Sequence, residues 1–100
     1  MQGTTRKLLT VICEARLESS LTADVMRLGA HGYTVTDARG RGSRGVRNAV
    51  WDSAANIRLE VVCEERVAQQ IAEHLQNHYY DNFDMILFSA DVEVLRPEKF

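Results

Sequence analysis

The fold is decided by the stretch Ala55-Asn56-Ile57-Arg58-Leu59-Glu60-Val61-Val62-Cys63-Glu64. Apolar residues alternate with mostly polar ones along it, which is typical of a strand with one buried and one exposed face. The residues that follow carry Val67, Ile71 and Leu75, spaced as on one face of a helix. We therefore expect a strand over residues 55–64 and a helix over about 65–78.

The N-terminal part of the chain predicts a strand and a helix as well. Residues 1–6 are expected to form a flexible start, and the apolar, β-branched run at residues 7–15 a central strand. A helix with an apolar face should follow, with Ser19 or Ser20 as its N-cap. It should end near Gly29 or Gly32.

Further strands are expected at residues 33–36, at 85–88 and, as a short fifth strand, at 92–95. Pro97, the only proline, should then stop regular structure. The element order is βαββαβ, the ferredoxin-like arrangement, in which two helices cover one face of an antiparallel sheet. The sequence thus predicts an α+β fold, and the length of 100 residues suits a single domain, residues 1–100.

The composition is that of an ordinary soluble globular domain, with 45% hydrophobic and 26% charged residues. A net charge of −2 shows that the chain as a whole is not suited to binding polyanions. The sheet face without helices carries apolar residues such as Val35 or Val62, so an oligomer built sheet to sheet is expected. Cys13 and Cys63 lie in apolar runs, which favours buried thiols. With no signal peptide or membrane-spanning stretch, the cytoplasm is the expected location.

The connection between the second and third strands, about residues 38–54, is unusually long. Its first part, Ala38–Arg47, contains four arginines and three glycines. Glycine lets backbone N–H groups approach an anion closely, and arginine matches phosphate or carboxylate oxygens. An anion-binding loop is one interpretation, and a solvated or nonspecific nucleic-acid-binding loop is the other. Trp51, later in the loop, either contacts a partner or folds back onto the domain.

Other kinds of site have weaker support. Nucleic-acid binding by the sheet is not expected, because sheets of this topology read RNA with paired aromatics, and the corresponding positions hold Thr10, Ile12 and Arg58. His74 and His78 could share a metal, but no third ligand is signalled nearby. No Ser–His–Asp set, Cys–His pair or paired carboxylates are suggested, so an enzyme is not expected.

Several motifs resemble the PII signalling family. Gly32-Tyr33-Thr34-Val35-Thr36-Asp37, followed by Gly40-x-Gly42, is similar to the strand and turn at the base of the family's long T-loop. More narrowly, Gly40–Arg47 and the ending Val94–Phe100 resemble the PII-like proteins linked to bicarbonate transporters and carboxysomes.

The resemblance implies a PII-like homotrimer with a T-loop at about residues 40–55 and adenine-nucleotide sites in the clefts between subunits. Thr34 and Val62 match positions that contact adenine, and Glu60 matches a glutamate beside the site. The positions that match phosphate-binding residues of the family are Gly40, Gly42, Ser43, Arg44, Arg47 and Arg96.

The expected function is a non-enzymatic sensor of adenine nucleotides. The segment before the last strands lacks the Gly-x-Gly-Lys of ordinary PII proteins, so ADP, AMP or cyclic AMP should bind at least as well as ATP. Bicarbonate is the expected second ligand, held by Ser43 and Arg44 beside the phosphates. The T-loop would present Trp51 to a protein partner, such as a bicarbonate transporter or a carboxysome component.

Two alternatives share the predicted topology. One is a small acylphosphatase-like enzyme that binds phosphate through arginine. The other is a trimeric metal-responsive protein, for which His74 would be a ligand.

Overall fold

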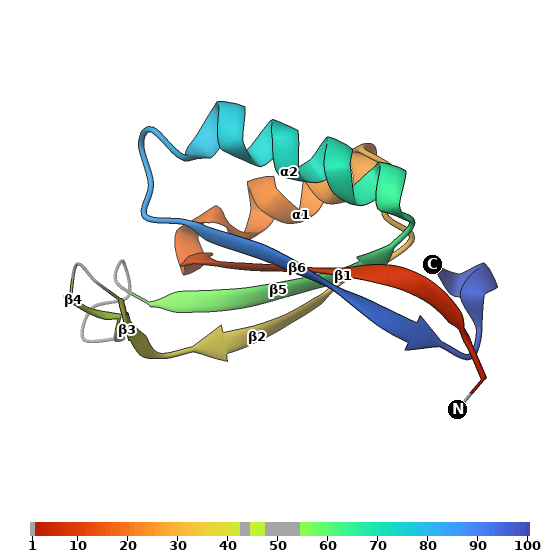
Figure 1. Ribbon diagram of the computed structural model, residues 1–100. Coiled ribbons are helices and arrows are strands. Elements are labelled where there is room, and N and C mark those ends of the chain that lie inside the picture. The colour runs from red at the N-terminus through yellow and green to blue at the C-terminus, as the bar shows by residue number, and fades with distance from the viewer. Residues whose placement is uncertain (1, 43–44, 48–54) are drawn as a thin grey trace.

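The computed structural model of the chain describes residues 2–42, 45–47 and 55–100, with the side chains of 45–47 left out. The main strands and helices follow the predicted order βαββαβ, with a short hairpin added in the connection between the second and third main strands (Figure 1). The main elements are β1 (Thr4–Glu14), α1 (Glu18–Arg27), β2 (Thr34–Ala38), β3 (Gly40–Gly42), β4 (Gly45–Arg47), β5 (Asn56–Cys63), α2 (Glu65–Tyr79) and β6 (Ile86–Val94). Short 3-10 turns follow β1, at Ala15–Leu17, and β6, at Pro97–Lys99.

The main sheet has the strand order β2-β5-β1-β6, and every neighbouring pair is antiparallel. Both helices lie against the same face of this sheet, and the other face is left without a helix (Figure 1). The strands β3 and β4 form a separate hairpin beyond the end of β2. This arrangement confirms the predicted α+β, ferredoxin-like fold.

The core lies between the sheet and the two helices. Alternate residues of β1 and β5 face the helices, and the pair Val11 and Leu59 stands opposite each other at the centre with no exposed surface. Both cysteines are buried there as predicted. The other fully buried side chains of the core include Leu9, Leu21, Val25, Val61, Ile71 and Leu75.

Val35 does not belong to the helix-free face. It stands opposite Leu59 in the β2–β5 pair and packs against the core. Val62, in contrast, lies between the buried Val61 and Cys63 and therefore falls on the helix-free face, opposite Leu8. Which residues of β2 face the core is hard to predict from sequence. All four residues of Tyr33-Thr34-Val35-Thr36 favour strands, so no pattern among them marks the buried face.

Two strand predictions were wrong in extent. Residues 4–6 of the expected flexible start belong to β1, where Thr4 pairs with Val94. The expected fourth and fifth strands form one continuous β6, because pairing with β1 runs unbroken through Ser89 and Asp91. An ion pair of 2.6 Å between Lys7 Nζ and Asp91 Oδ1 adds to this pairing.

The boundaries of α1 also differ from the prediction. The helix begins at Glu18, and its N-cap position is Leu17, which makes no side-chain cap, so neither serine caps it. Ser20 Oγ instead lies 3.0 Å from the hydroxyl of Tyr79 on α2. The end near Gly29 is confirmed, because this glycine adopts a left-handed conformation, φ 117°, directly after the helix. Pro97 does not end regular structure but begins the 3-10 turn.

Candidate functional site

Three of the predicted nucleotide-binding residues line one hollow on the helix-free face of the sheet. Thr34 and Glu60 stand opposite each other in the β2–β5 pair, and Val62 follows two residues further along β5. The hollow has a volume of about 290 Å³. Its remaining walls come from Leu8, Gly32, Tyr33, Lys99 and Phe100.

The hollow combines an apolar floor with a polar edge. Leu8 and Val62 are cross-strand neighbours, and both are half-buried. Glu60 is also half-buried, and its Oε2 accepts a hydrogen bond of 3.1 Å from Nη2 of the exposed Arg58. Such a mixture suits a flat ligand with an apolar face and hydrogen-bonding edges.

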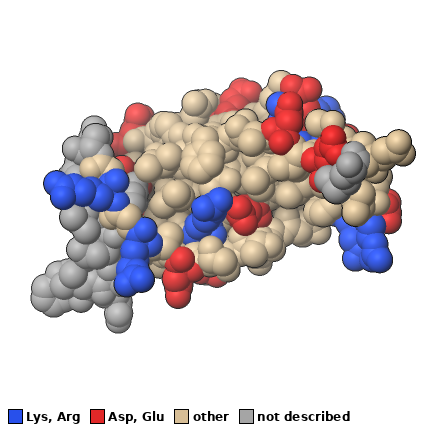
Figure 2. Space-filling view, turned by 60° about the horizontal axis from the view of Figure 1, so that its bottom comes forward, with Lys and Arg blue, Asp and Glu red and all other residues tan. Residues whose placement is uncertain are grey.

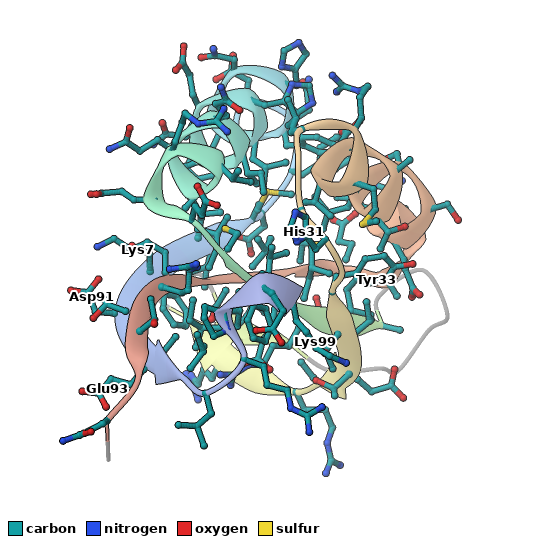
Figure 3. All side chains as sticks on the ribbon, turned by 90° about the vertical axis from the view of Figure 1, so that its right-hand side faces the viewer. Lys7, His31, Tyr33, Asp91, Glu93 and Lys99 are labelled. Atoms are coloured by element: carbon teal, nitrogen blue, oxygen red, sulfur yellow. The ribbon has the colours of Figure 1, made fainter. Side chains whose placement is uncertain are left out.

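The segment after β6 closes one side of the hollow. Residues 96–100 turn back, with the Lys99 N–H donating to the Arg96 carbonyl at 3.1 Å and the Phe100 N–H to the Pro97 carbonyl at 3.1 Å. Figure 3 looks onto this end of the molecule, where the labelled Lys99 and Tyr33 lie near each other. Phe100 is half-buried in this position.

Gly40 and Gly42 line a second, smaller hollow of about 140 Å³. The side chains around it are those of Ile12 and Ile86, with Ala38, Arg39 and Arg41. In Figure 2 basic side chains gather at this end of the molecule, beside the residues drawn in grey, and the middle of the face is mostly uncharged. A basic rim near a glycine-containing hairpin is suited to an anion.

The two groups of predicted site residues are not brought together within one chain. The two hollows share no lining residue, and Thr34 begins β2 whereas Gly40 lies beyond the end of that strand, at the start of β3. Arg96 is exposed and lines neither hollow. The backbone of Arg47 pairs with Gly40 in the β3–β4 hairpin. Ser43, Arg44 and Trp51 lie outside the described residues, as does the side chain of Arg47.

The two histidines proposed as metal ligands have other partners. Their rings stack with centroids 4.1 Å apart, so their ring nitrogens, which lie in the ring planes, do not converge on one point. His74 Nε2 lies 3.1 Å from Asp24 Oδ2, and His78 Nδ1 lies 2.9 Å from the His74 carbonyl oxygen. Across residues 2–42 and 55–100, no three His, Cys, Asp or Glu side chains cluster as metal ligands.

Asp24 is the centre of a polar network between the helices. The Tyr79 hydroxyl donates to its Oδ2 at 2.6 Å, and Arg27 Nη2 donates to its Oδ1 at 3.3 Å. Burial raises the pKa of Asp24, but hydrogen bonds from Tyr79, His74 and Arg27 together outweigh burial and hold this pKa below its ordinary value. Burial and the bond to Asp24 raise the pKa of Tyr79. We assign this network to the packing of α1 against α2.

Sequence reasoning missed five residues of the larger hollow: Leu8, Gly32, Tyr33, Lys99 and Phe100. Tyr33 could have been found from its place beside Thr34, and Leu8 from the register of β1 on β5. The position of Lys99 and Phe100 depends on how the chain turns after β6, and no local pattern signals that turn.

The model of the family described as "Nitrogen regulatory protein P-II" matches residues 6–99, nearly the whole chain. The chain belongs to the PII family. Among solved structures, a PII-like signalling protein from Thermus thermophilus is 44% identical to this PII protein, with a TM-score of 0.86 and coverage of 100% of this chain and 99% of that one.

Two structures of CPII, a nitrogen regulatory PII-like protein from Thiomonas intermedia, are also similar. The first, bound to ADP, AMP and bicarbonate, is 25% identical, with a TM-score of 0.89 and coverage of 99% of this chain and 96% of that one. The second, bound to ADP and bicarbonate, is 26% identical, with a TM-score of 0.87 and coverage of 99% and 97%. These similarities confirm the PII-like fold and the predicted family resemblance.

The hairpin of β3 and β4 falls within residues 40–55, where the T-loop is expected. In the part of the chain that the structure describes, no helix is both long and apolar enough to cross a membrane.

Proposed function

We propose that this PII protein is a non-enzymatic regulatory protein that binds ADP or AMP, with ATP and cyclic AMP as further candidates, between subunits of a homotrimer. The single observation that carries the proposal is the hollow of about 290 Å³ that joins Thr34, Glu60 and Val62. Its size is close to the lower limit of small-molecule sites, about 300 Å³. The binding of ADP and AMP by the similar CPII supports the choice of ligand.

The separation of the two hollows supports a site between subunits. A nucleotide whose base occupies the larger hollow does not reach the Gly40–Gly42 hairpin of the same chain if its phosphates point outward. A second copy could bring its own hairpin to the phosphates. The helix-free face offers apolar surface for such an assembly, including Ile86 and Phe88, which are 41% and 49% exposed.

Nucleotide binding would select one conformation of the T-loop. Ser43, Arg44, Arg47 and Arg96 are the candidates for holding the phosphates, with bicarbonate beside them at Ser43 and Arg44. A bicarbonate-bound CPII at 26% identity supports this second ligand. The partner that reads the T-loop would be a bicarbonate transporter or a carboxysome component, which places the protein in the cytoplasm and in inorganic-carbon metabolism.

A thermal-shift screen with ATP, ADP, AMP and cyclic AMP tests the nucleotide proposal. A ligand present at about 100 times its Kd should stabilise the protein by about 2.7 kcal/mol. We expect ADP and AMP to raise the melting temperature at least as much as ATP. Equal melting temperatures with and without all four nucleotides would contradict the proposal.

Isothermal titration of ADP with and without bicarbonate tests the second ligand. Bicarbonate should strengthen ADP binding in the wild type and have no such effect in Arg44→Ala. If the affinity and heat of ADP binding do not depend on bicarbonate, the two ligands are not coupled. Turnover of an acyl phosphate that Arg44→Ala abolishes would favour the acylphosphatase-like alternative instead.

A further inference from the structure

One wall of the larger hollow comes from the end of the 96–100 segment and contains none of the predicted site residues. The segment places Phe100 and Lys99 in the wall of the hollow, with Tyr33 also contributing. These residues surround the floor formed by Leu8 and Val62. The hollow therefore combines two aromatic side chains, two aliphatic side chains and one ammonium group.

The segment is held loosely by its own backbone. Among the described residues, its two backbone hydrogen bonds outside the strands, from Lys99 to Arg96 and from Phe100 to Pro97, stay within the turn. Its position over the sheet therefore depends on side-chain packing, and Pro97 and Phe100 are half-buried where the other side chains of the segment are exposed. A ligand in the hollow would add to this packing surface.

We propose that Tyr33 and Phe100 recognise the base of the nucleotide and that the 96–100 segment is a flap that the bound base holds in place. This inference rests on the proposed function, because it concerns the same hollow. Aromatic side chains bind flat π-systems by stacking. Every base can stack in this way, but larger bases stack more strongly. Lys99 brings a positive charge to the edge of the hollow, which favours an anionic ligand there.

Isothermal titration with ADP, AMP and CDP tests the roles of the two aromatic residues. Phe100→Ala and Tyr33→Ala should each weaken ADP binding about tenfold, the effect of one lost base stack. The affinity for AMP should fall by the same factor, because AMP carries the same base as ADP. The preference for ADP over CDP should narrow in both variants, an effect that a purely structural role would not produce.

Two further variants separate stacking from packing. Phe100→Trp should keep ADP affinity within about threefold of the wild type, because it preserves the aromatic face. Phe100→Leu keeps an apolar side chain but removes the ring, so the preference for ADP over CDP should narrow as in Phe100→Ala while the melting temperature without ligand stays unchanged. This variant also keeps the inference testable if Phe100→Ala folds poorly.

Tyr80→Ala is the matched control. Tyr80 is 39% exposed, follows α2 and does not line the hollow. Its removal should leave all three affinities unchanged. If the wild type binds ADP while Tyr33→Ala and Phe100→Ala behave like Tyr80→Ala, the inference is overturned and the proposed function stands. If the wild type binds none of the adenine nucleotides, the proposed function itself fails.

Discussion

At the scale of single residues, Asp24 shows how one carboxylate joins two helices. It lies on α1 and receives hydrogen bonds from Tyr79 and His74 on α2, in addition to Arg27 on its own helix. Because its side chain is only 20% exposed, these bonds are partly shielded from water. Bonds to a charged group of this kind typically stabilise a protein by about 1.5–3 kcal/mol.

Replacing Asp24 should therefore lower stability in a pH-dependent way. Its pKa is lowered in the folded protein, so its contribution is present above the ordinary carboxylate pKa, about 4, and is lost as the pH falls through the folded-state value. At pH 7, Asp24→Ala should reduce the free energy of unfolding by about 1.5–3 kcal/mol. Urea unfolding at pH 7 and at pH 3 measures this.

The matched variant is Asp24→Asn, which keeps the shape and can still accept from Tyr79 but does not titrate. The difference in stability between wild type and Asp24→Asn should shrink on acidification. A difference of equal size at both pH values would show that the charge of Asp24 does not contribute.

At the scale of elements, the alternation of β5 and the apolar faces of both helices were sufficient to predict their places in the fold. The extent of β6 could not be predicted, because Ser89-Ala90-Asp91 interrupts the apolar signal. These residues lie on an edge strand that pairs only with β1, where polar side chains are tolerated. The predicted N-cap of α1 was wrong: the N-cap position is Leu17, and Ser20 contacts Tyr79, a tertiary contact 59 residues away that no local rule contains.

The candidate site residues were identified by resemblance to the PII family, and the fold class explains why three of them lie together. Thr34, Glu60 and Val62 meet because β2 and β5 pair, and that pairing follows from the fold class. The contribution of Phe100 depends on the path of the chain after β6, and the contribution of a second copy depends on assembly. Neither is encoded in a local sequence pattern.

The end of α1 gives a prediction at this scale. Gly29 has φ 117°, a conformation that costs an L-residue roughly 1–2 kcal/mol, so Gly29→Ala should lower the free energy of unfolding by about that amount. Space is not the cause, since the nearest atom to an added Cβ would be Val67 Cγ2 at 3.4 Å. Chemical denaturation measures the effect.

Gly32→Ala is the control for this experiment. Gly32 does not have a left-handed conformation, and an added Cβ would meet nothing within 4 Å. Its replacement should leave stability unchanged or slightly higher. Equal losses in both variants would mean that the conformation of Gly29 does not determine the stability of this turn.

At the scale of the whole molecule, the helix-free face is the surface on which the proposed assembly depends. The register of β1 and β6 puts Phe88 on this face, opposite Thr10. A charge at a buried, apolar interface is strongly destabilising unless it is paired. Phe88→Glu should therefore convert the proposed trimer into monomers, as measured by light scattering, and abolish ADP binding with it.

Tyr80→Glu serves as the control, because Tyr80 is exposed after α2, on the side of the sheet that carries the helices. It should leave both the mass and the ADP affinity unchanged. A Phe88→Glu variant that stays trimeric, or a monomer that binds ADP with wild-type affinity, would contradict a site formed between copies.

The unbroken course of β6 has a consequence for such a trimer. The strand starts at Ile86, which lines the smaller hollow together with Gly40. Its other end leads into the 96–100 segment, where Phe100 lines the larger hollow. Each copy would then supply the larger hollow, which holds the base, to one site and the Gly40–Gly42 hairpin, which holds the phosphates, to the next. The single strand β6 would connect these two parts within each copy. Occupancy of the sites is therefore expected to be cooperative around the ring, so that ADP titrations deviate from a simple one-site isotherm.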